Sequence, residues 1–146
     1  NVPTLLEKPI SYTVEQAIEL KKYLPETVFV GLNRRFYSNV QKIKPLVEKS
    51  NEIFAQLYIP ERAKDLLSRD ELTRNHWHMA NGIHGVDLLT YLVGPAKEFY
   101  SRTAWGKLEY TKLSRFHTAR YQTTRGHQVS FMMNFDSPVG WSIHLL

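Results

Sequence analysis

The pattern of apolar residues changes abruptly at Gly94 and Pro95, and this change constrains the fold more than any other feature of the sequence. Before it, residues 82–93 have the apolar spacing of a helix, which the Gly-Pro pair would end. After it, aromatic and β-branched residues alternate with polar ones in four segments, namely residues 97–107, 110–124, 128–135 and 140–146. Alternation with a period of two predicts strands of an antiparallel sheet with one buried and one wetter face.

The first 35 or so residues have the signals of an α/β unit. Thr13 and Gln16 form a capping box that predicts the start of a helix, and Pro25 predicts its end. Residues 27–32 are apolar without alternation, which is typical of a strand that is buried on both faces.

Two further helix starts and one strand are predicted between these regions. Ser38 with Gln41 and Ser68 with Glu71 have the spacing of capping boxes. Pro45 is expected to kink or shorten the helix after the first box. A strand is expected over residues 53–59, closed by Pro60. Together these patterns predict an α+β fold.

Composition and charge narrow the class of protein. The chain has 146 residues, no cysteine and a formal net charge of +5. The absence of cysteine excludes disulfides and thiolate chemistry, and it fits a reducing compartment, so we expect a cytoplasmic protein. The basic residues are scattered rather than clustered, which favours a solvated surface over nucleic-acid binding. No segment approaches the roughly 20 apolar residues needed to cross a membrane, and we expect no membrane partner.

Three short clusters could carry chemistry. Glu7, Lys8 and Pro9 follow a short apolar segment, where a lysine can point into a cleft or lie in a surface turn. Residues 33–36 (N-R-R-F) follow the apolar strand of residues 27–32, and ligands of open α/β sheets bind at the carboxyl ends of strands. Two arginines there could meet an anionic group or simply cover the end of the sheet.

The third cluster contains His84 and Asp87, which are three residues apart and share a helix face. A carboxylate beside an imidazole raises its pKa and fixes its tautomer, which suits proton transfer near neutral pH. A purely structural contact between the two side chains is an equal alternative. His76 and His78 could add metal ligands, but this spacing is weak evidence and we expect no metal.

In this order the three clusters resemble the motifs of the Gfo/Idh/MocA oxidoreductases, a family that includes glucose–fructose oxidoreductase and inositol dehydrogenase. The matching segments are E-K-P at residues 7–9, G-x-N-R-R-F at residues 31–36, and G-x-H-x-x-D at residues 82–87. The resemblance covers residues 3–94 and rests on the order and spacing of these motifs.

The resemblance implies an NAD(P)-dependent oxidoreductase that acts on a sugar, a polyol or a sugar derivative. Lys8 and His84 would be the catalytic residues, and Glu7, Lys8 and Pro9 would contact the NAD or NADP cofactor. The residues that would bind the carbohydrate-like substrate are Asn33, Arg34, Arg35, Asn81 and Asp87.

The resemblance also implies a domain organisation. Residues 1–36 would be the tail of a Rossmann-type dinucleotide-binding domain, and residues 37–146 a C-terminal α+β domain for substrate binding and oligomerisation. This second domain would be a predominantly antiparallel sheet with helices on one face, and we expect a homo-oligomer formed through the sheet. Since the sequence contains no G-x-G-x-x-G, the chain is expected to be the substrate-side fragment of a longer enzyme.

One departure from the family pattern keeps a second function open. Ala80 stands where the family has an aspartate that often contacts substrate. The alternative is therefore a non-catalytic, ligand-sensing or regulatory member of the same fold.

Overall fold

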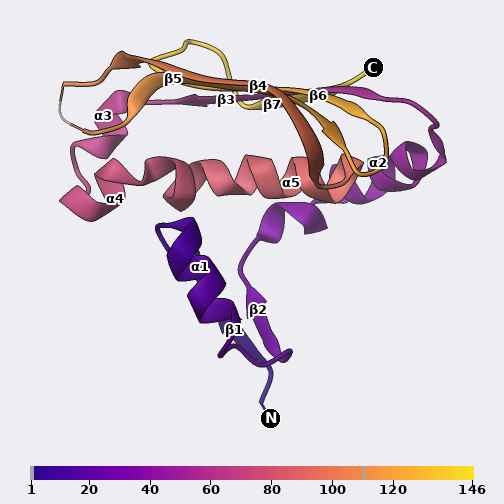
Figure 1. Ribbon diagram of the computed structural model, residues 1–146, viewed down its shortest axis with the longest axis horizontal. Helices are drawn as coiled ribbons and strands as arrows, with labels where there is room; N and C mark the ends of the chain where they lie inside the picture. The colour runs from indigo at the N-terminus through magenta and orange to yellow at the C-terminus, as the bar shows by residue number, and fades with distance from the viewer. Residues whose placement is uncertain (1, 110) are drawn as a thin grey trace.

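The computed structural model describes residues 2–109 and 111–146. Tyr110, where the sequence placed the start of a strand, lies outside the described residues. A curved five-stranded sheet covers a layer of helices, and a small unit near the N-terminus lies on the other side of the long helix α5 (Figure 1). The fold therefore agrees with the predicted α+β arrangement of a sheet with helices on one face.

The N-terminal unit consists of β1 (Thr4–Leu6), α1 (Val14–Lys21) and β2 (Val28–Val30), with the two strands paired in parallel. The capping box at the start of α1 is confirmed, since Thr13 accepts from the Gln16 amide and the Gln16 side chain accepts from the Thr13 amide. The prediction that the second strand is buried on both faces is wrong for the described residues, because Phe29 is 58% exposed.

The helical layer contains six segments, which are η1 (Asn33–Phe36), α2 (Ser38–Lys49), α3 (Ala63–Leu66), α4 (Glu71–Asn75), η2 (His78–Gly82) and α5 (Ile83–Val93). The second predicted capping box is wrong: Tyr37 is the cap residue of α2, and the side-chain Nε2 of Gln41 donates to the Arg35 carbonyl instead. Helix α2 also continues through Pro45.

The third predicted box is wrong as well. Asp70, rather than Ser68, caps α4 by accepting from the Thr73 amide. Helix α5 ends where the sequence predicted, at Gly94, whose φ of 95° suits glycine.

The large sheet contains β3 (Phe54–Glu61), β4 (Ala96–Lys107), β5 (Ser114–Thr123), β6 (Gln128–Phe135) and β7 (Ser142–Leu145), in the order β4-β5-β6-β3-β7. The four predicted C-terminal strands are confirmed: β6 has the predicted bounds, β4 begins one residue earlier, and β5 and β7 are shorter than predicted. Neighbouring strands are antiparallel except β3 and β6, which are parallel, so the sheet is predominantly antiparallel as predicted.

Pro60 does not close β3, which continues to Glu61. The pairing of β3 with β7 ends at Tyr58, and the Pro60 carbonyl accepts from the Trp141 indole beyond that point. Since the proline nitrogen lies on the same side as this carbonyl, its missing N–H removes no bond from the ladder.

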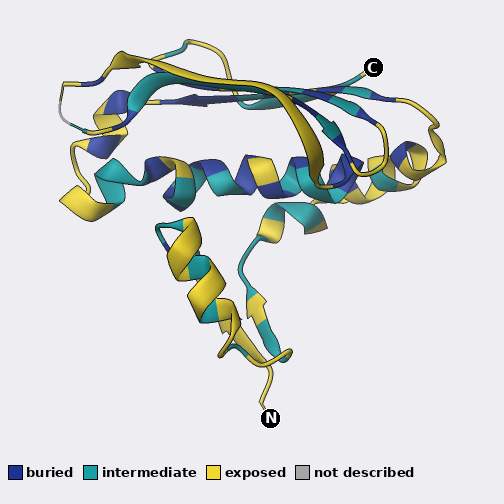
Figure 2. Ribbon diagram, in the orientation of Figure 1, coloured by how far each residue is buried: buried dark blue, intermediate teal, exposed yellow. Residues whose placement is uncertain are grey.

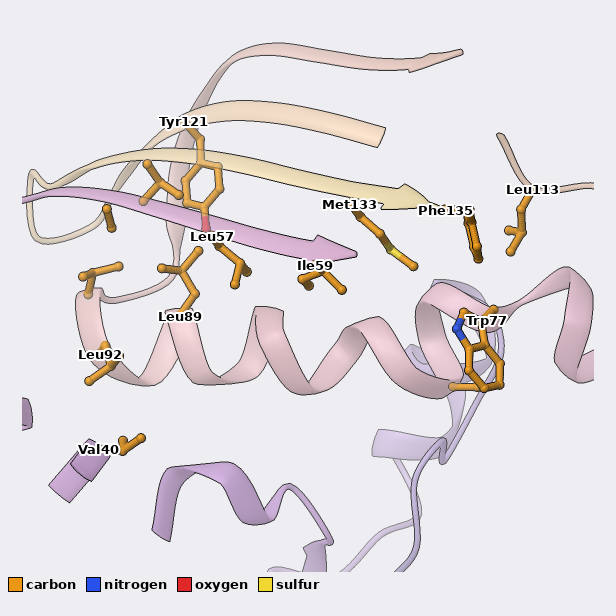
Figure 3. Close-up of a cluster of buried hydrophobic side chains, with 14 of the residues drawn as sticks. Val40, Leu57, Ile59, Trp77, Leu89, Leu92, Leu113, Tyr121, Met133 and Phe135 are labelled. Carbon is orange, nitrogen blue, oxygen red and sulfur yellow. The ribbon is translucent and has the colours of Figure 1, made fainter. Parts of the chain in front are cut away.

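The hydrophobic core lies between the inner face of the sheet and helix α5. Leu57 of the sheet lies above Leu89 of the helix (Figure 3). Ile59 and Met133 lie further along the same face of the sheet, against Gly85 and Gly82. Burial is concentrated along this contact, whereas edge strand β4 is exposed throughout (Figure 2). In the part of the chain that the structure describes, no helix is long and apolar enough to span a membrane.

Candidate active site

The loop after β1 lies against the N-terminal part of the helical layer. A pocket of about 210 Å³ lies between the carboxyl ends of β1 and β2 and the η2–α5 junction. Its lining is mostly apolar and comprises Lys8, Pro9, Ile10, Ser11, Ala17, Val30, Leu32, Met79 and Ile83. The position agrees with the rule that ligands bind at the carboxyl ends of parallel strands.

Lys8 is fixed on this pocket by the helical layer. Its Nζ donates a hydrogen bond of 2.6 Å to the carbonyl oxygen of Ala80, one turn before His84. An ammonium group has three donors, so two remain for other partners. Glu7 is exposed, and the Lys8–Pro9 peptide bond is cis. The bond between Lys8 and Ala80 thus joins residues that are more than 70 positions apart in the sequence.

His84 is a buried imidazole with an unusual environment. The side chain is 9% exposed, and Nδ1 is buried without a hydrogen-bond partner among the described residues. Burial lowers the pKa of His84, and the positive charges of Lys8 and Arg34 lower it further, against smaller opposing effects of Asp87 and Glu7. The imidazole is therefore neutral near pH 7, which is the form that can accept a proton.

The predicted partnership between His84 and Asp87 is wrong. Asp87 is 8% exposed and forms a two-point ion pair with Arg35, in which Arg35 Nε lies 2.7 Å from Asp87 Oδ2 and Arg35 Nη2 contacts Oδ1. This pair raises the pKa of Arg35. A nearby arginine satisfies the carboxylate better than a neutral imidazole does, so Asp87 joins η1 to α5 and forms no hydrogen bond with His84.

The other residues of the 33–36 cluster differ in their surroundings. Asn33 is exposed. The guanidinium carbon of Arg34 lies 3.9 Å from the centroid of the Trp141 ring, a cation–π contact that connects η1 to the loop before β7. Burial lowers the pKa of Arg34, whereas the charge of Glu61 opposes this effect. Arg34 thus lies within electrostatic range of both His84 and Glu61.

Sequence reasoning missed Glu61. This carboxylate at the end of β3 is 6% exposed and accepts from Trp77 Nε1 at 2.9 Å and from Asn81 Nδ2 at 2.8 and 3.0 Å. Burial raises the pKa of Glu61, while these hydrogen bonds and the charge of Arg34 lower it. The signal in the sequence was an acidic residue directly after a buried strand, which the expected break at Pro60 concealed.

The histidines before α5 do not gather around one point. His76 Nδ1 lies 2.9 Å from the Leu72 carbonyl, and the His78 ring lies 6.2 Å from the His117 ring. Within residues 2–109 and 111–146, no group of three or more histidine, aspartate or glutamate side chains is placed to hold a metal ion.

Comparison with known proteins supplies the class of fold. No protein-family model and no curated protein matches the chain. Solved structures do match: the WlbA dehydrogenase of Bordetella pertussis, in complex with NADH and UDP-GlcNAcA, is 21% identical with a TM-score of 0.77, covering 97% of this chain and 47% of that one. An oxidoreductase of Thermotoga maritima is 18% identical with a TM-score of 0.74, with coverage of 97% and 47%.

A third match is the MviM dehydrogenase of Clostridium difficile, which is 20% identical with a TM-score of 0.68 and coverage of 97% and 45%. The chain thus has the fold of one part of these dehydrogenases and spans about half the length of the structures it matches. The resemblance seen in the motifs is confirmed at the level of the fold.

Proposed function

We propose that the chain is the substrate-side part of an NAD(P)-dependent oxidoreductase that acts on a sugar, a polyol or a sugar derivative. One observation carries the proposal: Lys8 lines a pocket at the carboxyl ends of two parallel strands, its ammonium group is bonded to the turn just before His84, and its charge acts on that imidazole, in a fold shared with dehydrogenases. WlbA was crystallised with NADH and a nucleotide sugar, which supports both the cofactor class and the substrate class.

The pocket beside Lys8 fits the nicotinamide end of the cofactor. Its apolar walls suit a flat ring. Lys8 and Pro9, which line the pocket, and the exposed Glu7 before them are the residues that would contact it. A bound nicotinamide would supply the hydride acceptor or donor. The phosphates would be held by another part of the enzyme, since this sequence has no G-x-G-x-x-G.

The two catalytic residues have complementary roles in this proposal. His84, neutral at pH 7, takes the proton of the reacting hydroxyl. Lys8 uses its remaining N–H donors to stabilise the negative charge that develops on the substrate oxygen. Its bond to the Ala80 carbonyl keeps the ammonium group close to the turn that carries His84.

The remaining assignments complete the proposal. Asn33, Arg34, Arg35, Asn81 and Asp87 form the substrate side, with the Arg35–Asp87 pair holding the wall together. Residues 1–36 belong to the dinucleotide-binding domain and residues 37–146 to the substrate and oligomerisation domain. We further propose a homo-oligomer formed through the sheet and a cytoplasmic location.

A substrate screen on the full-length protein that carries this chain tests the proposal. Nicotinamide absorbance is followed with sugars, polyols and nucleotide sugars, including UDP-GlcNAcA. We expect turnover of at least one substrate, and its loss in both Lys8→Ala and His84→Ala. Lys21→Ala and His144→Ala change exposed residues away from the pocket and should leave turnover unchanged.

Ala80 favours a second candidate, a regulatory protein that binds ligand without turning it over. This candidate predicts cofactor or sugar binding by calorimetry with no change in nicotinamide absorbance for any substrate. That result would overturn the catalytic roles of Lys8 and His84.

A further inference from the structure

Glu61 is a buried carboxylate that accepts hydrogen bonds from Trp77 and Asn81, in the helical segments just before His84. It pairs in register with Phe135, and both side chains point from the sheet into the helical layer. Its Oε2 accepts from the Trp77 indole at 2.9 Å, and both oxygens accept from Asn81 Nδ2, at 2.8 and 3.0 Å. The carboxylate therefore binds Asn81, which lies three residues before His84.

These contacts fix the orientation of the Asn81 amide. An ionised carboxylate only accepts hydrogen bonds, so the NH₂ group of Asn81 must face Glu61 and the carbonyl Oδ1 must face away. Among the described residues, none donates to Asn81 Oδ1, and the side chain is half-buried rather than enclosed. Asn81 lies in the π-helical turn η2, three residues before His84 at the start of α5, so the two side chains are neighbours along the chain.

We propose that Glu61 is a positioning residue that locks the Asn81 amide so that Oδ1 accepts a hydrogen bond from a substrate hydroxyl beside His84. This assignment rests on the proposed function and adds the device that selects a hydroxyl-bearing substrate. Asn81 touches the sugar, and Glu61 acts only through Asn81.

The lock depends on the charge of Glu61. Trp77 can only donate, so a protonated Glu61 keeps one oxygen as its acceptor and offers its own proton to Asn81 Oδ1, which reverses the amide. Arg34 from η1 favours the ionised form, Asp65 from α3 opposes it, and burial raises the pKa of Glu61. Substrate affinity therefore falls as the pH is lowered through this pKa.

Side-chain amide NMR on the ¹⁵N-labelled chain tests the lock without any substrate. The Asn81 cross-peak, assigned by its loss in Asn81→Ser, should shift with a midpoint above 4.5, the ordinary pKa of glutamate. In Glu61→Gln, which keeps an acceptor for Trp77, this midpoint should vanish. The Asn75 amide, whose Oδ1 accepts from the Lys112 amide, is the matched control and should lack this midpoint in both proteins.

A cross-peak of Asn81 that lacks the midpoint in the parent, or that keeps it in Glu61→Gln, overturns the lock. Circular dichroism of both proteins establishes that each is folded, and Glu61→Asp serves as a second variant if Glu61→Gln is not. Since Asp retains the charge, it should restore a titration of the Asn81 amide.

The substrate arm uses the sugar that the screen identifies, together with its single-deoxy analogues. We expect Glu61→Gln to raise KM by roughly three- to tenfold with kcat nearly unchanged, the worth of one neutral hydrogen bond. It should also remove the discrimination against one particular deoxy analogue. Retained discrimination overturns the role of Asn81 Oδ1. If no sugar is turned over, the proposed function fails, whereas the amide titration separately decides whether Glu61 orients Asn81.

Discussion

At the scale of single residues, the arrangement of the site depends on which partner each charged side chain pairs with. Asp87 lies on the face of α5 that His84 shares, yet its carboxylate pairs with Arg35 from η1. The sequence could predict the shared face from spacing alone. It could not predict the competing arginine, because 52 residues separate Arg35 from Asp87 and only the folded chain brings them together.

The lowered pKa of His84 makes stability depend on pH in a defined direction. The unfolded chain takes up a proton near the ordinary pKa of 6.5, whereas the folded chain resists it until a lower pH. Unfolding thus binds protons, so stability falls as the pH drops from 6.5 toward the folded pKa and then levels off. His84→Gln should lose less stability than the parent over this window.

Urea unfolding at pH 7.5, 6.5 and 5.5 measures this effect. His144→Gln, which changes an exposed histidine, should follow the parent at each pH. If His84→Gln shows the same decline as the parent, the imidazole is not held neutral by its surroundings.

At the scale of elements, the start of a helix depends on its N-cap residue, and the sequence can offer more than one candidate for it. Ser68 with Glu71 has the spacing of a capping box, but Asp70 is the residue whose side chain accepts from the Thr73 amide. Ser68 instead donates to the Asp65 carbonyl. Several polar residues in one short segment can each cap a helix, and the position of α3 decides between them.

Removing the observed cap tests this assignment. Asp70→Ala should lower Tm by about 2–4 °C, because one amide at the start of α4 loses its acceptor. Ser68→Ala, which removes the cap expected from the sequence, should change Tm by much less. Thermal unfolding by circular dichroism compares the two, and equal losses would contradict the structure.

The contact between α5 and β3 requires a glycine at position 85. A Cβ atom there would lie 2.5 Å from Ile59 Cδ1 and 3.3 Å from Trp141 Cζ3, and Ile59 is fully buried. The clash would separate the helix that carries His84 from the sheet. Gly85→Ala should therefore reduce the free energy of unfolding by about 1–3 kcal/mol.

A double-mutant cycle identifies the cause of this loss. Ile59→Val removes Cδ1 and alone should cost about 0.5–1.5 kcal/mol. The double variant should lose less unfolding free energy than the two single variants lose together, since the atom that clashes is gone. Additive losses in urea unfolding would show that the clash with Ile59 is not what Gly85 avoids.

At the scale of the whole molecule, local pattern predicted the layers but not the order of the strands. Alternation identified the four C-terminal strands, and motif order identified the class of fold that the solved structures share. The parallel pairing of β3 with β6 was not predictable, because the paired residues are more than 70 positions apart in the sequence. Nothing in the sequence of β6 indicates which strand it pairs with. Glu61 was missed for another reason, because the expected break at Pro60 placed it outside the strand and the sequence does not show that Trp77 and Asn81 lie beside it.

The outer face of the sheet is the surface through which we expect the chain to self-associate. Trp105 and Phe116 are paired in register with their rings stacked 5.1 Å apart, on the face opposite to the buried Tyr121. Met132 of β6 lies on the same outer face, and Trp105 is 45% exposed and Met132 38% exposed. In a monomer these apolar side chains stay in contact with water, whereas a dimer would bury them. Removing apolar area from water favours association.

Sedimentation velocity over a range of concentrations tests this surface. We expect the parent chain to form a dimer or larger oligomer, and Trp105→Lys with Met132→Lys to shift it toward the monomer, because each ammonium group would lose its hydration in the interface. Ile18→Lys is the control: Ile18 is 59% exposed on α1, away from the sheet, and its replacement should leave association unchanged. A parent chain that stays monomeric at every concentration, or an effect of Ile18→Lys equal to that of the sheet variants, would exclude the outer face as the interface and leave the sheet open for another role.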